Sequence, residues 1–218
     1  MNTPTREPLR FLVVSASGRA DSLNTQLARL AAATIEADGS VADLATVKDF
    51  AVPDYDGDAE ARNGIPLGAE HFKRRLEDAD ALVVVSPEYN ASIPGVLKNL
   101  LDWVSRFRPQ PFSDRQTLLM SASPSMVGGN RGLWALRVPL EHLGARVYPG
   151  MFSLARADTM LTTGGLLSDS YLQQRFDANV IDFVNLVEAA THYPRVKNAW
   201  AHQIGVCRHA HPAPGQTV

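Results

Sequence analysis

The sequence lacks the features that mark secreted, membrane-bound and nucleic-acid-binding proteins. Its 218 residues include one cysteine, Cys207, so no intrachain disulfide can form, as is usual in a reducing compartment. No apolar run approaches the ~20 residues needed to span a bilayer, and the first ten residues, MNTPTREPLR, lack the apolar core of a secretory signal. The net charge of −2 indicates no anionic partner. We therefore expect a cytoplasmic protein with no nucleic-acid and no membrane partner.

Several ligand-binding motifs are also missing. There is no G-x-x-x-x-G-K-[ST] loop, and no G-x-G-x-x-G follows the first apolar run. The stretch DYDGD at 54–58 is not a calcium loop, because its glycine comes too early and Ile65 replaces the bidentate glutamate. Cys207, His209 and His211 do not have the spacing of a standard zinc site. We therefore predict no metal site, no ATP chemistry and no standard dinucleotide site, which leaves a mononucleotide.

Short apolar runs alternate with amphipathic helical patterns along the chain. This alternation predicts βαβ units, a parallel sheet with helices on both faces, and a three-layer α/β sandwich. Residues 52–64 are predicted to form a polar loop. Residues 1–194 are expected to form one domain and 195–218 a loosely ordered extension. The predicted strands are 9–15, 41–47, 79–86, 115–123 and 145–155, the last interrupted at Pro149-Gly150, and the predicted helices are 23–39, 68–78, 96–107, 133–143 and 168–190.

The loop after the first predicted strand, SASGRADSLNTQ, combines hydroxyls, an amide and a positive charge. A helix follows it directly, and the first turn of a helix offers unpaired N–H groups and the positive end of a dipole. This combination suits a terminal phosphate. Alternatively, Ser22 or Asn24 only caps the helix. The candidate phosphate-binding residues are Ser17, Arg19, Ser22, Leu23, Asn24 and Thr25.

Two further loops should meet this one, because ligands of open α/β sheets bind beyond the carboxyl ends of the strands. In SPEYNASIPGVLKNLLDW, residues 86–103, an aromatic ring stands among backbone donors, which suits a flat heterocycle. In SASPSMVGGNRG, residues 121–132, two glycines permit close approach of the backbone. The candidate binding residues in these loops are Pro87, Glu88, Tyr89, Asn90, Ser123, Ser125, Gly128 and Gly129.

The same stretches resemble the NADPH-dependent FMN reductases, flavodoxin-like proteins that include quinone, azo-dye and chromate reductases. SPEYNASIPGVLKNLLDW closely matches the family pattern P-E-Y-N-x-S-x-P-G-x-L-K-N-x-x-D-W, and SASGRADSLNTQ is similar to the family phosphate loop. The resemblance covers residues 10–190. The chain departs from the pattern at Ala16 and Gly18, where the family commonly has glycine and a larger residue, and Asp21 would weaken phosphate binding if it pointed inward.

The resemblance implies a flavodoxin-like fold with a five-stranded parallel sheet of order 2-1-3-4-5. It implies an FMN whose phosphate sits in the first loop and whose isoalloxazine lies against residues 87–90, with the 123–129 loop on its other side. It also implies a homodimer or homotetramer, with NADPH, or NADH, as electron donor. Arg131 is a candidate for holding the 2′-phosphate of NADPH.

The resulting hypothesis is an FMN-dependent NAD(P)H oxidoreductase that passes hydride to a small-molecule acceptor such as a quinone, an azo compound, a metal oxyanion or free flavin. No catalytic side chain is nominated, since the flavin would carry the chemistry. The alternative is a non-enzymatic flavin-binding electron carrier or redox sensor. Carriers of this kind tend to be strongly acidic, and the net charge of −2 argues against one.

Overall fold

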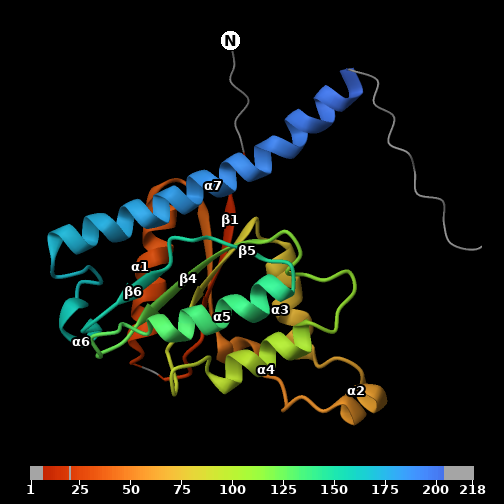
Figure 1. The fold of residues 1–218 in the computed structure, drawn as a ribbon, viewed down its shortest axis with the longest axis horizontal. Coiled ribbons are helices and arrows are strands. Elements are labelled where there is room, and N and C mark those ends of the chain that lie inside the picture. The colour runs from red at the N-terminus through yellow and green to blue at the C-terminus, as the bar shows by residue number, and fades with distance from the viewer. Residues whose placement is uncertain (1–6, 20, 204–218) are drawn as a thin grey trace, which may run out of the picture.

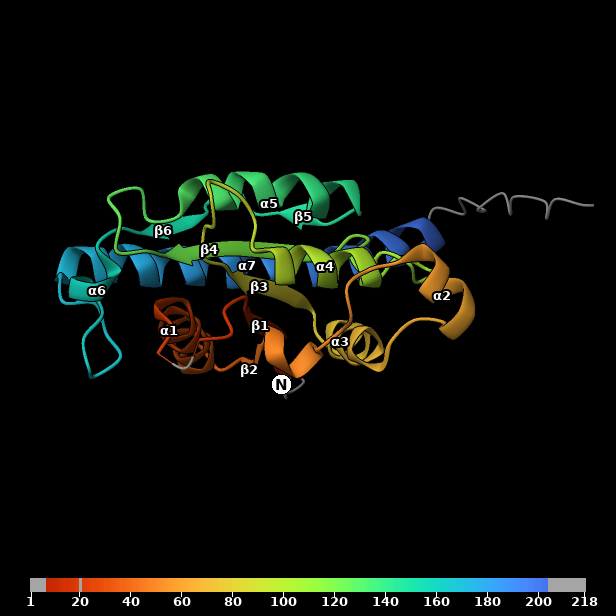
Figure 2. The same cartoon turned by 90° about the horizontal axis from the view of Figure 1, so that it is seen from below.

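A computed structural model describes residues 7–19 and 21–203, and side-chain surroundings as far as residue 191. Its centre is a parallel sheet of the order β2-β1-β3-β4-β5, as predicted. Figure 2 shows β2, β1, β3 and β4 following one another from bottom to top, with α1 and α3 on opposite sides of the sheet. The strands are β1 (Arg10–Ser15), β2 (Val41–Thr46), β3 (Ala81–Val85), β4 (Gln116–Ala122), β5 (Arg146–Val147) and β6 (Phe152–Leu154).

The sheet has six strands instead of the predicted five, because the interrupted fifth strand forms two pieces. β5 pairs with Gln116 and Thr117 at the beginning of β4, whereas β6 pairs with residues 120–122 at its end. Pro149 lies between the two pieces, and it has no N–H group to donate to the ladder. Both pieces pair parallel to β4, as the predicted parallel sheet requires.

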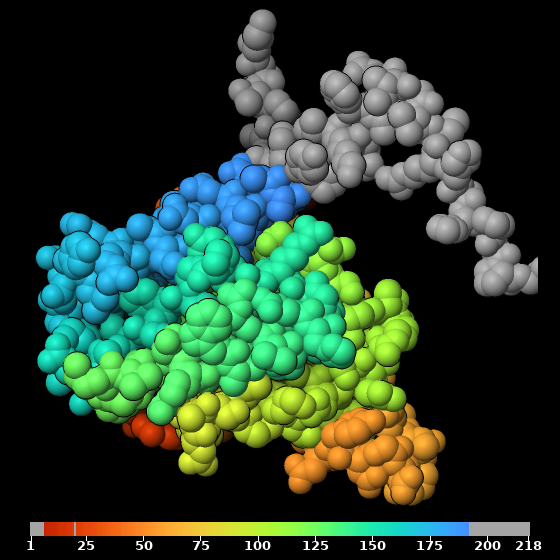
Figure 3. Space-filling view, viewed as in Figure 1, coloured from red at the N-terminus to blue at the C-terminus, as the bar shows by residue number. Residues whose placement is uncertain are grey.

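The helices differ from the prediction in four segments. Val47–Phe50 forms a 3₁₀ turn and Ala157–Met160 a single helical turn, and neither was predicted. Residues 57–63 form a short helix within the segment expected to be a polar loop; none of its residues is buried, and Figure 3 shows it projecting from the body. The last helix continues to Gln203, beyond its expected end near residue 190, and residues 204–218 lie outside the described part. The helices are α1 (Leu23–Ala37), the 3₁₀ turn η1 (Val47–Phe50), α2 (Gly57–Asn63), α3 (Leu67–Glu77), α4 (Gly95–Val104), α5 (Asn130–His142), α6 (Ala157–Met160) and α7 (Ser170–Gln203).

The two faces of the sheet bury two separate apolar cores, because successive side chains of a strand point to opposite sides. Phe11 and Val13 pack in the core with α1 and α7, while Leu12 and Val14 pack in the core with α3, α4 and α5. Figure 1 shows α7 crossing above the sheet and α5 and α4 in front of it. This double burial explains why β1 and β3 read as continuous apolar runs. No described helix is long and apolar enough to cross a membrane.

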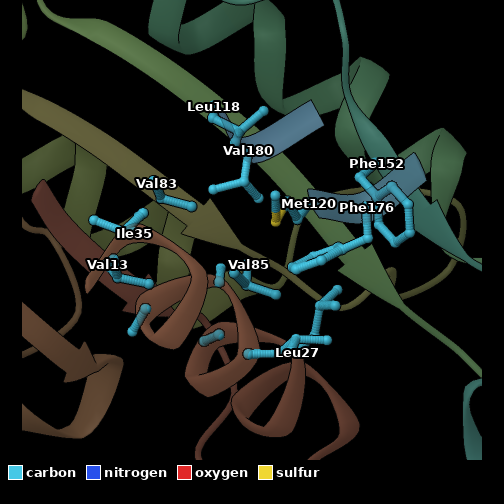
Figure 4. Packing of buried hydrophobic residues seen from close by; sticks show 14 of the residues in the cluster. Val13, Leu27, Ile35, Val83, Val85, Leu118, Met120, Phe152, Phe176 and Val180 are labelled. Atoms are coloured by element: carbon cyan, nitrogen blue, oxygen red, sulfur yellow. The ribbon is translucent and has the colours of Figure 1, made fainter. Parts of the chain in front are cut away.

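The first core depends on the aromatic residues of α7. Figure 4 shows Phe176 beside Phe152 of β6 and Met120 of β4, with Val180 one turn further along α7. The rings of Phe176 and Phe152 meet edge to face, with centroids 5.1 Å apart, and Phe176 is fully buried. The contact holds the long last helix against the end of the sheet where the candidate loops lie.

Replacing Phe176 by alanine should lower the free energy of unfolding by about 3–5 kcal/mol, because a large cavity would form in this core. Tyr171→Ala is the matched control, since this ring lies on the same helix, is 70% exposed and has the guanidinium of Arg175 6.0 Å from its centroid. The control should cost less than about 1 kcal/mol. Urea denaturation of both variants measures the difference, and equal losses would contradict the assigned packing of α7.

Candidate functional site

The three candidate loops meet at the carboxyl edge of the sheet around one small pocket. Its volume is about 150 Å³, and its wall includes Ser17, Arg19, Ser22, Leu23, Asn24, Pro87, Glu88, Tyr89, Ala122, Ser123 and Pro124. Two of these residues, Ala122 and Pro124, were absent from the predicted set, although they flank Ser123 in a loop already singled out. The predicted residues outside this wall are Thr25, Asn90, Ser125, Gly128 and Gly129.

The polar residues that begin α1 hold the fold together as well as lining the pocket. Ser22 is the N-cap, and its hydroxyl accepts from the Thr25 N–H at 3.4 Å. The Asn24 amide makes two hydrogen bonds with Ala122 at the end of β4, one donated to the carbonyl and one accepted from the N–H, each of 2.9 Å. The Thr25 hydroxyl is 2.8 Å from that of Ser15 in the interior. Ser22 therefore caps α1 and also lines the pocket.

The start of α1 nevertheless keeps groups that can bind an anion. The first intrahelical bond of α1 runs from Gln26 N–H to Ser22, and the cap takes the N–H of Thr25. The N–H groups of Leu23 and Asn24 have no acceptor among the described residues, as expected for a first helical turn. Both residues line the pocket, together with the exposed Arg19 and the hydroxyl-bearing Ser17.

The carboxylate of Asp21 is not part of the pocket. Asp21 lines a separate groove between α1 and residues 162–166, together with Gln26 and Arg29. The sequence predicted weaker phosphate binding only if this carboxylate pointed inward. Its position in the neighbouring groove removes that objection.

The second loop presents an exposed aromatic ring on a tight turn. Tyr89 and Ser92 exchange two backbone hydrogen bonds, of 3.1 and 3.0 Å, across Asn90 and Ala91. Both central residues have positive φ, 51° and 60°, which is the pattern of a type I′ turn. The left-handed region costs a residue with a Cβ about 1–2 kcal/mol. The turn leaves Tyr89 50% exposed at the rim of the pocket, and Asn90 is not part of the pocket wall.

The Glu88 carboxylate joins the second loop to the third. It accepts from the guanidinium of Arg131, with a shortest distance of 2.5 Å, and from the Gly132 N–H at 3.1 Å. Burial by itself would raise the pKa of Glu88, but the hydrogen bonds from Arg131 and Gly132 outweigh it and hold this pKa below its usual value. Glu88 therefore remains ionised at neutral pH and positions the start of α5. Arg131, the candidate for the NADPH 2′-phosphate, is committed to this ion pair.

Gly128 and Gly129 are required by the packing of the third loop. Both have positive φ, 65° and 83°. A Cβ at Gly129 would lie 2.0 Å from the Ser121 hydroxyl oxygen, and one at Gly128 would lie 2.9 Å from the Ala155 nitrogen. Only glycine satisfies both constraints at these positions. Ser125 is also outside the pocket wall, and its hydroxyl is 3.1 Å from that of Ser123.

The part of the chain that the structure describes contains no cluster of three metal-ligating side chains. Cys207, His209 and His211 lie outside the described residues. The pocket itself is lined by the start of α1, by the exposed ring of Tyr89 and by residues 122–124.

A 2-1-3-4-5 parallel sheet with such a loop after its first strand defines a flavodoxin-like nucleotide-binding protein. Within that class, the chain belongs to the NADPH-dependent FMN reductase family, whose model matches residues 9–159. It is thus an oxidoreductase of a family that uses FMN and NAD(P)H, as the resemblance implied.

Three known proteins illustrate the relationship. The quinone reductase of Escherichia coli is 36% identical over 141 residues, which cover 65% of this chain and 74% of that protein. An NAD(P)H-dependent FMN reductase of Pseudomonas aeruginosa is 35% identical over 137 residues, 63% of this chain and 72% of that protein. The solved structure of FerB, a flavoenzyme NAD(P)H:(acceptor) oxidoreductase of Paracoccus denitrificans, superposes with a TM-score of 0.70 at 26% identity, covering 83% of this chain and 98% of FerB.

Replacing Asn24 by alanine should destabilise the protein by about 2–4 kcal/mol, because both polar groups of Ala122 would lose their partner in a buried place. Asn99→Ala is the matched control: its amide also bridges two backbone groups, Tyr55 N–H and Pro53 carbonyl, but at the surface. Water can replace those bonds, so this variant should lose about 1 kcal/mol or less. Thermal and urea unfolding of the two variants make the comparison, and a smaller loss for Asn24→Ala would refute the role of the bridge.

Proposed function

We propose that this chain binds FMN at the carboxyl edge of its sheet and uses it to reduce a small-molecule acceptor at the expense of NAD(P)H. The observation that carries the proposal is the convergence of the free N–H groups of Leu23 and Asn24 with Ser17 and Arg19 around one pocket. Such a convergence is what a terminal phosphate requires.

The pocket suits the phosphate end of FMN rather than the whole molecule. Its volume of about 150 Å³ is below the roughly 300–1,000 Å³ of sites that enclose a ligand. The isoalloxazine would therefore lie over the open rim, against Pro87 and the exposed ring of Tyr89 on one side and Ser123 and Pro124 on the other. Gly128 lets this loop pack against the end of β6 and Ala155, and Gly129 lets it pack against Ser121 of β4.

When bound, FMN supplies the redox chemistry, since it can take a hydride from a nicotinamide and deliver electrons to a second substrate. The protein would bind the phosphate and orient the ring at the open rim, between the second and third loops. Glu88 is ion-paired with Arg131 and ionised, so it positions α5 and is assigned no proton transfer. No side chain needs to act as nucleophile or general base.

A quinone is the acceptor that we favour among quinones, azo compounds, metal oxyanions and free flavin. The E. coli relative is named a quinone reductase, and a relative from Burkholderia, 44% identical over 100 residues, is named a 2-hydroxy-1,4-benzoquinone reductase. The half-exposed Tyr89 ring at the open rim fits a flat aromatic substrate that stacks on a flavin. NADPH is the donor expected from the family, with NADH as the alternative.

A non-enzymatic electron carrier or redox sensor is the competing function. Either would bind FMN in the same pocket but would not oxidise NADPH continuously. Steady-state oxidation of NADPH in the presence of a quinone therefore separates the two functions. The moderate net charge of −2 supports the enzyme.

We further propose that the chain forms a homodimer, or a homotetramer built from it, through the exposed side of α5. Trp134 and Val138 are 58% and 70% exposed and lie one turn apart on this helix. Met126 and Val127, in the loop before α5, are 74% and 43% exposed. Four large apolar side chains in one short segment beside the pocket are typical of a protein interface.

Arg19→Ala should raise the dissociation constant for FMN about tenfold, because an exposed guanidinium would no longer face the phosphate. Arg29→Ala is the matched control: it removes the same charge from the neighbouring groove and should leave FMN affinity unchanged. Fluorescence titration measures both, and riboflavin, which has no phosphate, should bind the two variants equally. If Arg19→Ala binds FMN like the parent protein, the phosphate site is misplaced. A parent protein that binds no FMN and does not oxidise NADPH would refute the proposed function.

Trp134→Glu should convert the dimer to monomer, since a carboxylate buried at the centre of an apolar interface carries a large desolvation cost. Light scattering of the variant and the parent protein measures the mass. Leu67→Glu, at an 80% exposed residue of α3, is the control and should not change it. A monomeric parent protein, or a Trp134→Glu variant of unchanged mass, would contradict this interface.

A further inference from the structure

The Lys48 side chain lies across the loop that follows β1. Lys48 belongs to η1, which directly follows β2, and β2 pairs with β1 so that Thr46 lies opposite Ser15. The carboxyl ends of the two strands therefore meet at the same edge of the sheet. A Cβ built on Gly18 would lie 3.1 Å from Cε and 3.8 Å from Cγ of Lys48. The lysine stem thus packs over Gly18, between two residues of the pocket wall, Ser17 and Arg19.

Gly18 is needed because a larger side chain would meet Lys48, and not because its backbone has a conformation that only glycine can adopt. Gly18 is not among the residues with positive φ, so its backbone can accept any L-residue. What a side chain there would meet is the far half of Lys48. Gly18 is also a position at which the chain departs from the larger residue expected from the family pattern. The small residue therefore makes room for the lysine.

The charge of Lys48 is not neutralised by a carboxylate in the described part of the chain. The neighbouring carboxylate of Asp49 caps η1, where it accepts from the Thr46 N–H at 2.6 Å and from the Thr46 hydroxyl at 3.1 Å. Lys48 itself is exposed, and no ion pair of this residue is found among the described residues. An ammonium group held beside the phosphate loop is therefore available to a ligand.

We propose that Lys48 is a second cationic ligand of the FMN phosphate, and that Gly18 is small so that the lysine can reach it. The inference rests on the proposed function. A phosphate monoester carries a charge of about −1.5 to −2 at neutral pH, so Arg19 by itself compensates only part of it. Lys48 approaches from the β2 side of the loop, next to Gly18. The two cations and the helix start would then surround the phosphate.

Lys48→Met should raise the dissociation constant for FMN about tenfold while leaving that for riboflavin unchanged. Methionine keeps an unbranched stem over Gly18 but removes the charge. Lys73→Met is the matched control, since Lys73 pairs with Glu77 of the same helix, α3. The FMN affinity of Lys48→Met should also depend less on salt, and Lys48→Arg should retain most of the binding.

Gly18→Val provides a second measurement, because its side chain should push the lysine aside. The variant should weaken FMN binding in the parent protein and have little effect in the Lys48→Met background, so that the two changes are not additive. Equal FMN affinity in Lys48→Met and Lys73→Met would overturn the assignment of Lys48 and leave the proposed function standing. An equal loss of riboflavin affinity would show that the substitution does not act through the phosphate, which also overturns it. A parent protein that binds no FMN would overturn both this inference and the proposed function.

Discussion

The candidate site depends on the two hydrogen bonds between the Asn24 amide and the backbone of Ala122. They connect the first turn of α1 to the last residue of β4, so the first and third loops cannot separate without breaking them. Because both groups of Ala122 are buried, losing these bonds would leave two polar groups unsatisfied. The ion pair of Glu88 with Arg131 performs the corresponding task between the second and third loops. Together the two bridges hold three loops, distant in sequence, around one pocket.

Several residues that look functional in the sequence spend their polar groups on this scaffold. Ser22 caps α1, the Thr25 hydroxyl is hydrogen-bonded inside the protein, and the Asn24 amide bridges the N–H and carbonyl of Ala122. What they leave exposed to a ligand is mainly backbone N–H at the start of the helix. A fixed backbone donor is an efficient anion ligand, because it needs no side-chain ordering when the ligand binds.

The alternation of apolar runs and helical patterns was sufficient to predict a parallel sheet with helices on both faces, and the resemblance to the reductase family supplied the order of the strands. It was not sufficient for the last strand, which forms two pieces, one on each side of Pro149. One piece pairs with the beginning of β4 and the other with its end, so the division depends on the length of β4. The helix at 57–63 was also missed, since its residues bury nothing and show no apolar periodicity. Lys48 had no signal in the sequence, as its proximity to Gly18 arises only from the pairing of β1 with β2.

The sequence by itself determined the fold class, the three loops and the family, because these follow from local periodicity and from a long contiguous motif. Only the tertiary structure decided which atoms of those loops remain free for a ligand. It showed that Asp21 faces another groove, that Arg131 is bound to Glu88, and that Gly128 and Gly129 serve packing. The physical reason is that a polar side chain forms hydrogen bonds or ion pairs with the groups that lie beside it. Those groups come from residues far apart in the chain, and they meet only when the sheet brings its loops together.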